Sequence, residues 1–192
     1  VDAIVHVLRC FEDDNVTHVE NSIGPLRDAE TVETELMLAD MDSVERRADQ
    51  AAKKAKGGDK ETREMIAVME PVLAALRAGN PARTARPADA AQRKIFTGLQ
   101  LLTGKPVLYA CNVEEASAAT GNVLSRKVAE RAKAEGAGVV VISAAIEAEV
   151  AQLADPAEQQ EFLASLGLSE TGLTQVIRAG YALLDLITYF TV

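Results

Sequence analysis

Residues 105–115 read KPVLYACNVEE, a short apolar run with Lys-Pro before it and a polar loop after it. Two similar apolar runs occur at residues 4–8 and 139–142. Short continuous apolar strands that alternate with helical patterns are typical of a parallel sheet covered by helices on both faces. The sequence therefore predicts an α/β fold. In such folds ligands bind at the carboxyl ends of the strands, so the polar residues that follow each run are the first candidates for a site.

The helical patterns lie between and after these runs. Residues 12–28 are polar and contain Asn, Gly and Pro, and residues 79–88 are rich in Pro and Gly, so both segments are predicted to be loops. Helices are expected at about residues 89–102, 123–135, 145–154, 156–166 and 170–186.

Residues 29–78 interrupt the alternation of strands and helices. Apolar residues there follow the three- and four-residue steps of a coiled-coil seam. In the first half they are Met37, Met41, Val44, Ala48, Ala51 and Ala55, and in the second Ile66, Met69, Leu73 and Leu76. Gly57-Gly58 separates the two halves, and Asp59 is a candidate N-cap for the second helix. The segment is predicted to be an inserted antiparallel coiled-coil helical hairpin.

Composition limits the classes of function. With 192 residues and 48% hydrophobic content, the chain can bury one full core or a core plus a small appendage. The net charge of −9 argues against broad nucleic-acid binding, although a local basic patch is compatible with it. Cys10 and Cys111 lie in apolar runs and are predicted to be buried free thiols of a cytoplasmic protein. No apolar stretch is long enough to cross a membrane, and no metal site is expected within these residues.

Two of the predicted strand ends resemble the base-binding elements of the GTPase superfamily. There one strand ends in Asn-Lys-x-Asp and a later strand ends in Ser-Ala. Here the strand at 107–111 is followed by Asn112-Val113-Glu114-Glu115, and the strand at 139–142 by Ser143-Ala144. A four-residue match alone is better explained as the cap of the next helix. The presence of both elements in the same order favours a functional site.

The differences from the GTPase pattern change the base that the site prefers. An Asp at the fourth position accepts the N1–H and N2 amine of guanine, and adenine offers neither donor. Glu115 and Val113 replace the Asp and the Lys of the pattern, while Asn112 can still bond N7 and the Val113 carbonyl can accept the N6 amine of adenine. Loss of a site-defining hydrogen bond can relax or invert selectivity. The site is therefore expected either to tolerate adenine or to prefer it.

Beyond these motifs, the chain resembles the YchF/Obg-like ATPase family, also labelled EngD in bacteria, of the P-loop GTPases. The resemblance covers essentially the whole chain. It rests on residues 2–20, 25–28, 33–40, 53–60, 105–115, 142–153 and 176–192. It implies a G domain at residues 1–28 and 79–192, a hairpin insertion at 29–78, and ATP favoured over GTP. It also implies Mg²⁺ in the intact protein and the ribosome or RNA as partner.

The resemblance also implies that part of the site is missing from these residues. The family's phosphate-binding motif, G-x-x-x-x-G-K-[ST], does not occur in the chain. It is expected upstream of Val1 together with the magnesium ligands, and a TGS domain is expected after Val192. That loop supplies most of the nucleotide affinity and the geometry of phosphoryl transfer. The chain alone is therefore not expected to hydrolyse ATP.

Two further features carry a functional and a neutral interpretation. By the resemblance, His18 takes the place of the water-orienting glutamine of Ras-like enzymes, but a solvent-exposed loop histidine explains it equally well. Lys53, Lys54, Lys56 and Lys60 cluster at the hairpin tip, where they suit RNA or an acidic protein surface. Cations also stabilise the C-terminus of a helix, which is the neutral explanation.

Three classes of function compete. The leading hypothesis is part of an ATP or GTP hydrolase that acts as a translation-linked switch. The alternative is a non-catalytic interaction module, in which the coiled-coil hairpin binds a partner and the sheet supports it. A dinucleotide-binding domain is weakly supported, because no G-x-G-x-x-G follows a strand.

Overall fold

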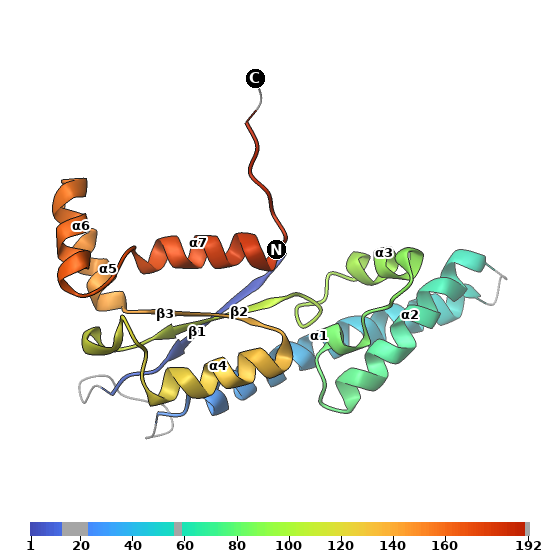
Figure 1. Cartoon of the computed structure of the whole chain (residues 1–192). Helices are drawn as coiled ribbons and strands as arrows, with labels where there is room; N and C mark the ends of the chain where they lie inside the picture. Colours follow the sequence, from blue (N-terminus) through green and yellow to red (C-terminus); the bar gives the residue numbers. More distant parts are fainter. Residues whose placement is uncertain (13–22, 56–58, 191–192) are drawn as a thin grey trace. The chain divides into compact units, whose positions relative to one another are not determined.

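The computed structural model describes residues 1–12, 23–55 and 59–190 (Figure 1). The chain divides into two compact units, one of Val1–Ala29 with Val107–Val192 and the other of Glu30–Pro106. We call them the sheet unit and the helical unit.

The sheet unit is built on three parallel strands in the order β1-β2-β3. They are β1 (Ile4–Arg9), β2 (Val107–Asn112) and β3 (Gly138–Ile142). The register places Asn112 opposite both Arg9 and Ile142, so the three strands end at the same level. The predicted α/β fold with a parallel sheet is confirmed.

Alternate residues of β2 point to opposite faces of the sheet. Tyr109 and Cys111 pack with the buried face of α4, while Leu108 and Ala110 pack with α7. These helices cover opposite faces because successive side chains of a strand alternate (Figure 1). The helices of this unit are α4 (Val123–Glu135), α5 (Ala144–Val150), α6 (Pro156–Ser165) and α7 (Gly172–Leu183).

The helical unit contains most of α1 (Pro25–Ala55) and all of α2 (Lys60–Arg77). The two helices run antiparallel. Glu45, near the middle of α1, pairs with Arg77 at the end of α2 across 2.8 Å, and Ala51 lines a pocket with Met65 near the start of α2. Their apolar faces join one core. The coiled-coil geometry predicted from the residue spacing stays a prediction.

Residues 79–106 pack with the helices rather than with the sheet. Phe96 of α3 (Ala90–Gly98) and Leu99 are buried in the same core as the two helices, as is Ala82 of the short helix η1 (Ala82–Ala85). The compact units therefore divide the chain at different points from the domain boundaries expected above. Those boundaries concern membership of a G domain, which compactness does not test, so they stay a prediction.

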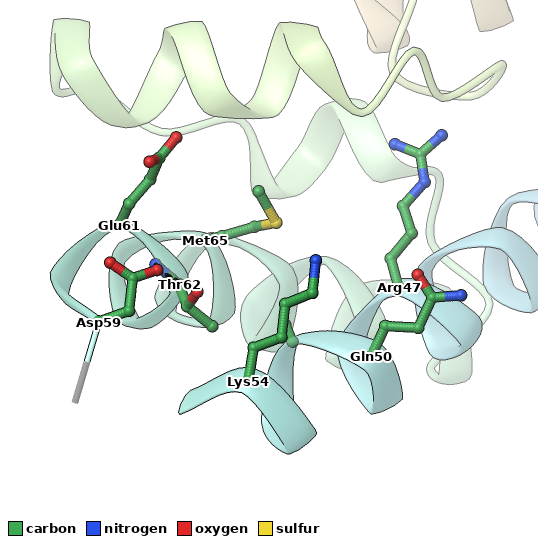
Figure 2. A pocket seen from close by; sticks show the side chains of 8 residues that line it. Arg47, Gln50, Lys54, Asp59, Glu61, Thr62 and Met65 are labelled. Atoms are coloured by element: carbon green, nitrogen blue, oxygen red, sulfur yellow. Dashed lines mark hydrogen bonds between the residues drawn. The ribbon is translucent and has the colours of Figure 1, made fainter. Parts of the chain in front are cut away.

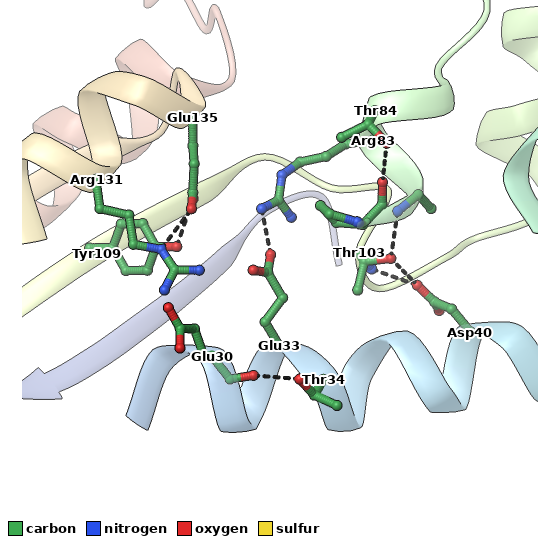
Figure 3. A network of polar contacts seen from close by, with 12 residues as sticks. Glu30, Glu33, Thr34, Asp40, Arg83, Thr84, Thr103, Tyr109, Arg131 and Glu135 are labelled. Carbon is green, nitrogen blue, oxygen red and sulfur yellow. Dashed lines mark hydrogen bonds and ion pairs between the residues drawn. The ribbon is translucent and has the colours of Figure 1, made fainter. Parts of the chain in front are cut away.

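A buried carboxylate fixes this returning segment to α1. Asp40 is 3% exposed and accepts hydrogen bonds from the backbone N–H of Leu102 at 2.8 Å and from Thr103 twice at 2.7 Å, through its backbone N–H and its hydroxyl. The Thr103 hydroxyl in turn accepts a bond from the Ala82 N–H at 3.0 Å. Figure 3 shows the Asp40–Thr103 contact beside the ion pair of Glu33 with Arg83.

Helix α1 begins at Pro25, although residues up to 28 were predicted to be loop. Proline is well suited to the first position of a helix, because its missing N–H has no partner there and its φ is already helical. Two other predictions are confirmed: the Asp59 side chain accepts a bond from the Thr62 N–H at 3.1 Å, and both cysteines are free and buried. Among the described helices, none is long and apolar enough to span a membrane.

Candidate functional site

The predicted base-binding residues lie at the carboxyl edge of the sheet, where β2 and β3 end. Strand pairing continues just beyond the strands: the Cys10 N–H donates to the Asn112 carbonyl at 2.7 Å, and the Val113 N–H donates to the Ile142 carbonyl at 2.9 Å. The loops that follow all three strands therefore start from a fixed backbone.

Asn112 joins the two predicted motifs directly. Its side-chain oxygen Oδ1 accepts a hydrogen bond from the Ala144 N–H at 2.9 Å. Because that oxygen is engaged, the amide is held in one orientation and presents its Nδ2 donor on the other side. A fixed N–H donor is the group required to bond an acceptor nitrogen such as N7 of a purine.

Ser143 contributes a hydroxyl without a partner. The residue is 4% exposed, and among the described residues no group hydrogen-bonds its Oγ. It precedes α5 but forms no side-chain cap with that helix. A buried hydroxyl without a partner is unfavourable by about 1–3 kcal/mol, so a polar group that reaches this position would be stabilised.

Val113 and Glu115 have different surroundings. The Val113 side chain is 2% exposed and belongs to the core beneath α4, so only its backbone can contact a ligand. Glu115 is the first residue of the short helix η2 (Glu115–Ser117) and its side chain is exposed. The structure thus places all five residues in two adjacent loops, with the Asn112–Ala144 bond as the direct link between them.

Two residues that the sequence analysis did not single out, Asn122 and Ser125, organise this edge of the sheet. Asn122 donates through Nδ2 to the Cys10 carbonyl at 2.6 Å and to a Glu114 oxygen at 2.9 Å. It also forms a reciprocal capping box with Ser125 at the start of α4. The signal was present in the sequence, because Asn followed three residues later by Ser resembles a helix-capping pair.

Glu114 has a perturbed carboxyl group. The Ser117 hydroxyl donates to it, and together with the Asn122 amide it lowers the pKa of Glu114 below its usual value. Hydrogen bonds to the charged form of a carboxyl favour that form. The carboxylate therefore stays ionised and keeps the loop after β2 tied to the start of α4.

A pocket of about 360 Å³ opens beside this edge, between the end of β1 and the start of α4. It is lined by Cys10, Phe11, Glu12, Glu114, Asn122, Val123 and Leu124. None of the five predicted base-binding residues lines it. It lies on the β1 side of the Asn112 loop, so it is a neighbour of the predicted site rather than the site itself.

Comparisons with known proteins show which proteins the chain as a whole is similar to. No family model matches the chain. The "ribosome-binding ATPase YchF" of Haemophilus influenzae is 48% identical over 99% of this chain, and that of Bacillus subtilis is 44% identical over all of it. A solved structure of the YchF GTPase of Schizosaccharomyces pombe matches the whole chain with a TM-score of 0.85 at 29% identity.

This chain belongs to the YchF family. It spans about half the length of the curated relatives it matches, since 52% of each of the proteins just named is covered. The relatives are named as an ATPase or a GTPase, which places the family among nucleotide hydrolases.

The basic tip of this YchF-family chain lies in the helical unit. Lys53 and Lys54 are exposed in the last turn of α1, and Lys60 is exposed in the first turn of α2, 3.7 Å from Glu64. Lys56 lies outside the described residues, as does His18. The helix dipole favours the lysines at the end of α1, but it disfavours a cation at the start of α2. Helix stabilisation therefore accounts for Lys53 and Lys54, whereas for Lys60 the unfavourable dipole is offset by its i,i+4 ion pair with Glu64.

Within residues 1–12, 23–55 and 59–190, no cluster of three or more His, Cys, Asp or Glu side chains is arranged to bind a metal ion.

Proposed function

We propose that this chain forms the base-recognition part of a YchF-type nucleoside triphosphatase, and that it prefers ATP to GTP. The observation that supports this most directly is the bond between Asn112 Oδ1 and the Ala144 N–H. It fixes one donor, Nδ2, at a strand end where ligands bind in α/β sheets.

The same bond favours adenine over guanine. A backbone N–H at the Ala144 position would suit the O6 acceptor of guanine, but here it already donates to Asn112. Guanine would then bring O6 to a site without a free donor. Adenine carries an amine at that position, and the Val113 carbonyl accepts no hydrogen bond from the described residues. An unpaired polar group on the wrong base lowers its affinity.

Glu115 and Ser143 complete the proposed site. Glu115 is exposed and a methylene longer than the Asp that reads guanine in the GTPase pattern, so its carboxylate is not held at the guanine N1–H and N2 amine. The unpartnered Ser143 hydroxyl gains a partner when the base edge or a bound water arrives.

Equilibrium binding to ATP and GTP tests the selectivity. In a full-length family protein with this sequence, the dissociation constant for ATP should be lower than that for GTP. Glu115→Asp should shift the ratio toward GTP, because the shorter carboxylate can accept from guanine. Equal affinities for both nucleotides, unchanged by Glu115→Asp, would refute the proposed base preference.

Hydrolysis is proposed for the full-length protein only. G-x-x-x-x-G-K-[ST] does not occur in these 192 residues, so the chain has no loop of this type to hold the phosphates and Mg²⁺. His18 is proposed to orient the attacking water. His18→Ala in the full-length protein should then lower turnover and leave ATP affinity unchanged, while the chain by itself should release no phosphate from MgATP. Unchanged turnover would remove His18 from the mechanism.

The basic tip is proposed to bind the ribosome, since the bacterial relatives are named as ribosome-binding. Lys60 supports this role, because its side chain is 91% exposed and adds to the positive charge of the tip. Lys53→Glu with Lys60→Glu should reduce co-sedimentation with ribosomes and flatten its dependence on salt. The matched control is Lys127→Glu with Lys133→Glu, two exposed lysines of α4 in the other unit. Equal losses of co-sedimentation in both variants would show that the lysines of the tip have no specific role in ribosome binding.

The alternative is a non-catalytic interaction module, in which the helices bind a partner without nucleotide. The helical unit has a core of its own, which supports this alternative. Isothermal titration separates the two: binding of ATP that is lost in Asn112→Ala favours the nucleotide hypothesis, and ribosome binding without any nucleotide affinity favours the module.

A further inference from the structure

A second pocket lies in the helical unit, between the end of α1 and the start of α2. It encloses about 320 Å³, within the size range of pockets that hold small organic groups. Figure 2 shows Arg47 and Lys54 projecting from α1 and Glu61 from α2, with Met65 between them. Nothing in the proposed nucleotide site uses these residues.

The pocket presents opposite charges on its two sides. Arg47, Gln50 and Lys54 recur at helical spacing on one side of α1, and seven residues of helix separate the two cations by about 10 Å along its axis. Glu61 and Asp59 lie on the α2 side, where Asp59 is engaged as the helix cap. Arg47 donates through Nη1 to the Leu99 carbonyl at 3.0 Å, which fixes one end of its guanidinium.

This arrangement does not suit a simple anion. The two cations are balanced by two carboxylates, so inorganic phosphate would gain little net attraction within the pocket. A ligand with an anionic part and a hydrogen-bond donor edge would satisfy both sides. The Met65 thioether and the Ala51 methyl add apolar surface between them, against which a flat ring can pack.

A nucleotide of single-stranded RNA has all of these parts. Its phosphates can pair with Arg47 and Lys54, its base can lie on Met65, and its Watson–Crick edge can donate to Glu61. Guanine offers a carboxylate two adjacent donors, N1–H and the N2 amine, whereas uracil offers one. The surroundings attract RNA: residues 46–64 contain seven basic and four acidic residues, in a chain whose net charge is −9.

We infer that this pocket receives one unpaired nucleotide of RNA, preferably guanine, with Glu61 reading the base and Arg47 and Lys54 holding the flanking phosphates. The inference rests on the proposed contact of the basic tip with the ribosome and names the group that the tip would bind. Removing an ordinary surface carboxylate should strengthen RNA binding, because the carboxylate repels the phosphates. Removing the Glu61 carboxylate should instead weaken RNA binding, because this carboxylate contacts the base.

Fluorescence anisotropy with labelled RNA heptamers tests whether replacing Glu61 weakens or strengthens RNA binding. The probes are UUUGUUU, UUUAUUU, UUUCUUU and UUUUUUU, titrated with the 192-residue chain. UUUGUUU should bind tightest. Glu61→Gln should weaken its binding by about fivefold or more and remove the preference for guanine, as expected for loss of a bidentate base contact. Lys54→Gln should weaken the binding of all four probes.

Glu64→Gln is the matched control. Glu64 lies in the same helix and is exposed, and its replacement by Gln removes the same charge as Glu61→Gln. Unlike Glu61, Glu64 pairs with Lys60 and does not line the pocket. It should leave UUUGUUU binding unchanged or tighter. If Glu61→Gln tightens binding as Glu64→Gln does, or if the unmodified chain shows no preference for guanine, the inference is wrong. Circular dichroism on each variant checks that the helices are retained.

Ribosome co-sedimentation separates this inference from the proposed function. Loss of co-sedimentation in the Lys53→Glu, Lys60→Glu variant without any guanine preference would leave the ribosome proposal standing and overturn the pocket. A guanine preference that depends on Glu61, with co-sedimentation unaffected by the lysine changes, would support the pocket and overturn the tip. If a labelled heptapeptide of glutamate binds through Arg47 and no RNA probe binds, the occupant is protein and the inference fails.

Discussion

Replacing Asn112 by Asp separates its role in the fold from its role in binding. Asp keeps the oxygen that accepts from the Ala144 N–H at 2.9 Å, so the link between the loops after β2 and β3 should persist and become charge-assisted. The substitution replaces the Nδ2 donor with a second acceptor. That acceptor would face N7 of the purine, which is itself an acceptor.

The expected loss of affinity follows from these two changes. A neutral hydrogen bond contributes about 0.5–1.5 kcal/mol, and an acceptor left without a donor at a desolvated contact is unfavourable by about 1–3 kcal/mol. Together they predict a loss of about 1.5–4.5 kcal/mol, or roughly 10- to 2000-fold in the dissociation constant for ATP. The stability of the sheet unit should stay within about 1 kcal/mol of the unmodified protein.

The assay is isothermal titration of a full-length family protein with this sequence, combined with urea unfolding. Asn80→Asp, an exposed change of the same charge in the helical unit, is the control and should bind ATP normally. Normal ATP binding by Asn112→Asp would refute the proposal that the amide donates to the base. Weak binding together with unfolding would show that the residue acts on the fold instead.

Three further predictions concern groups whose surroundings are unusual. Asp40→Asn replaces an acceptor opposite buried N–H donors and should lower the free energy of unfolding of the helical unit by about 2–4 kcal/mol, measured by urea denaturation. The thiol of Cys10 has a raised pKa because of its contact with Cys111 and its burial, so iodoacetamide should not label Cys10 at pH 8 until the chain is unfolded. The same contact lowers the pKa of Cys111, so burial alone is expected to keep the reagent from that thiol. The pKa of Glu114 is lowered, chiefly by the Ser117 hydroxyl, so the ionised carboxylate stabilises the loop at pH values above the usual carboxyl pKa. This stabilisation should disappear as the pH falls through the lowered pKa. An NMR titration of the carboxyl group measures the transition, and Glu114→Gln should abolish it.

Strand β2 could be predicted from the sequence because burial on both faces makes it continuously apolar. Strand β1 is apolar as well, although its Val5 and Val7 are exposed. The run at 107–111 ends within one residue of β2, and the run at 139–142 starts one residue after β3 begins. The start of α1 was misplaced, because the polar residues before it look like a loop until Pro25 is recognised as the first residue of a helix. The pattern of the apolar face carries no information on that boundary.

The site was predictable in part for a similar reason. The residues after β2 and β3 were identified, since parallel strands bring their carboxyl ends to one edge. The bond from Ala144 to Asn112 was not, because the sequence does not show which way a side-chain amide turns. Nor does it show that Asn122 reaches back to Cys10, a contact between residues 112 positions apart.

The packing of residues 79–106 bears on which function the chain performs. Asp40 holds the backbone of Leu102 and Thr103 only a few residues before β2 begins, so the segment leading into that strand is anchored within the helical unit. A partner that moves α1 would therefore pull on the chain that leads to Asn112. The two hypotheses from the sequence, a nucleotide switch and a helical interaction module, are then linked through the segment that leads into β2, which is one of the two places where the chain passes between the units. If they are coupled, Asp40→Asn should alter ATP affinity in the presence of ribosomes but not in their absence.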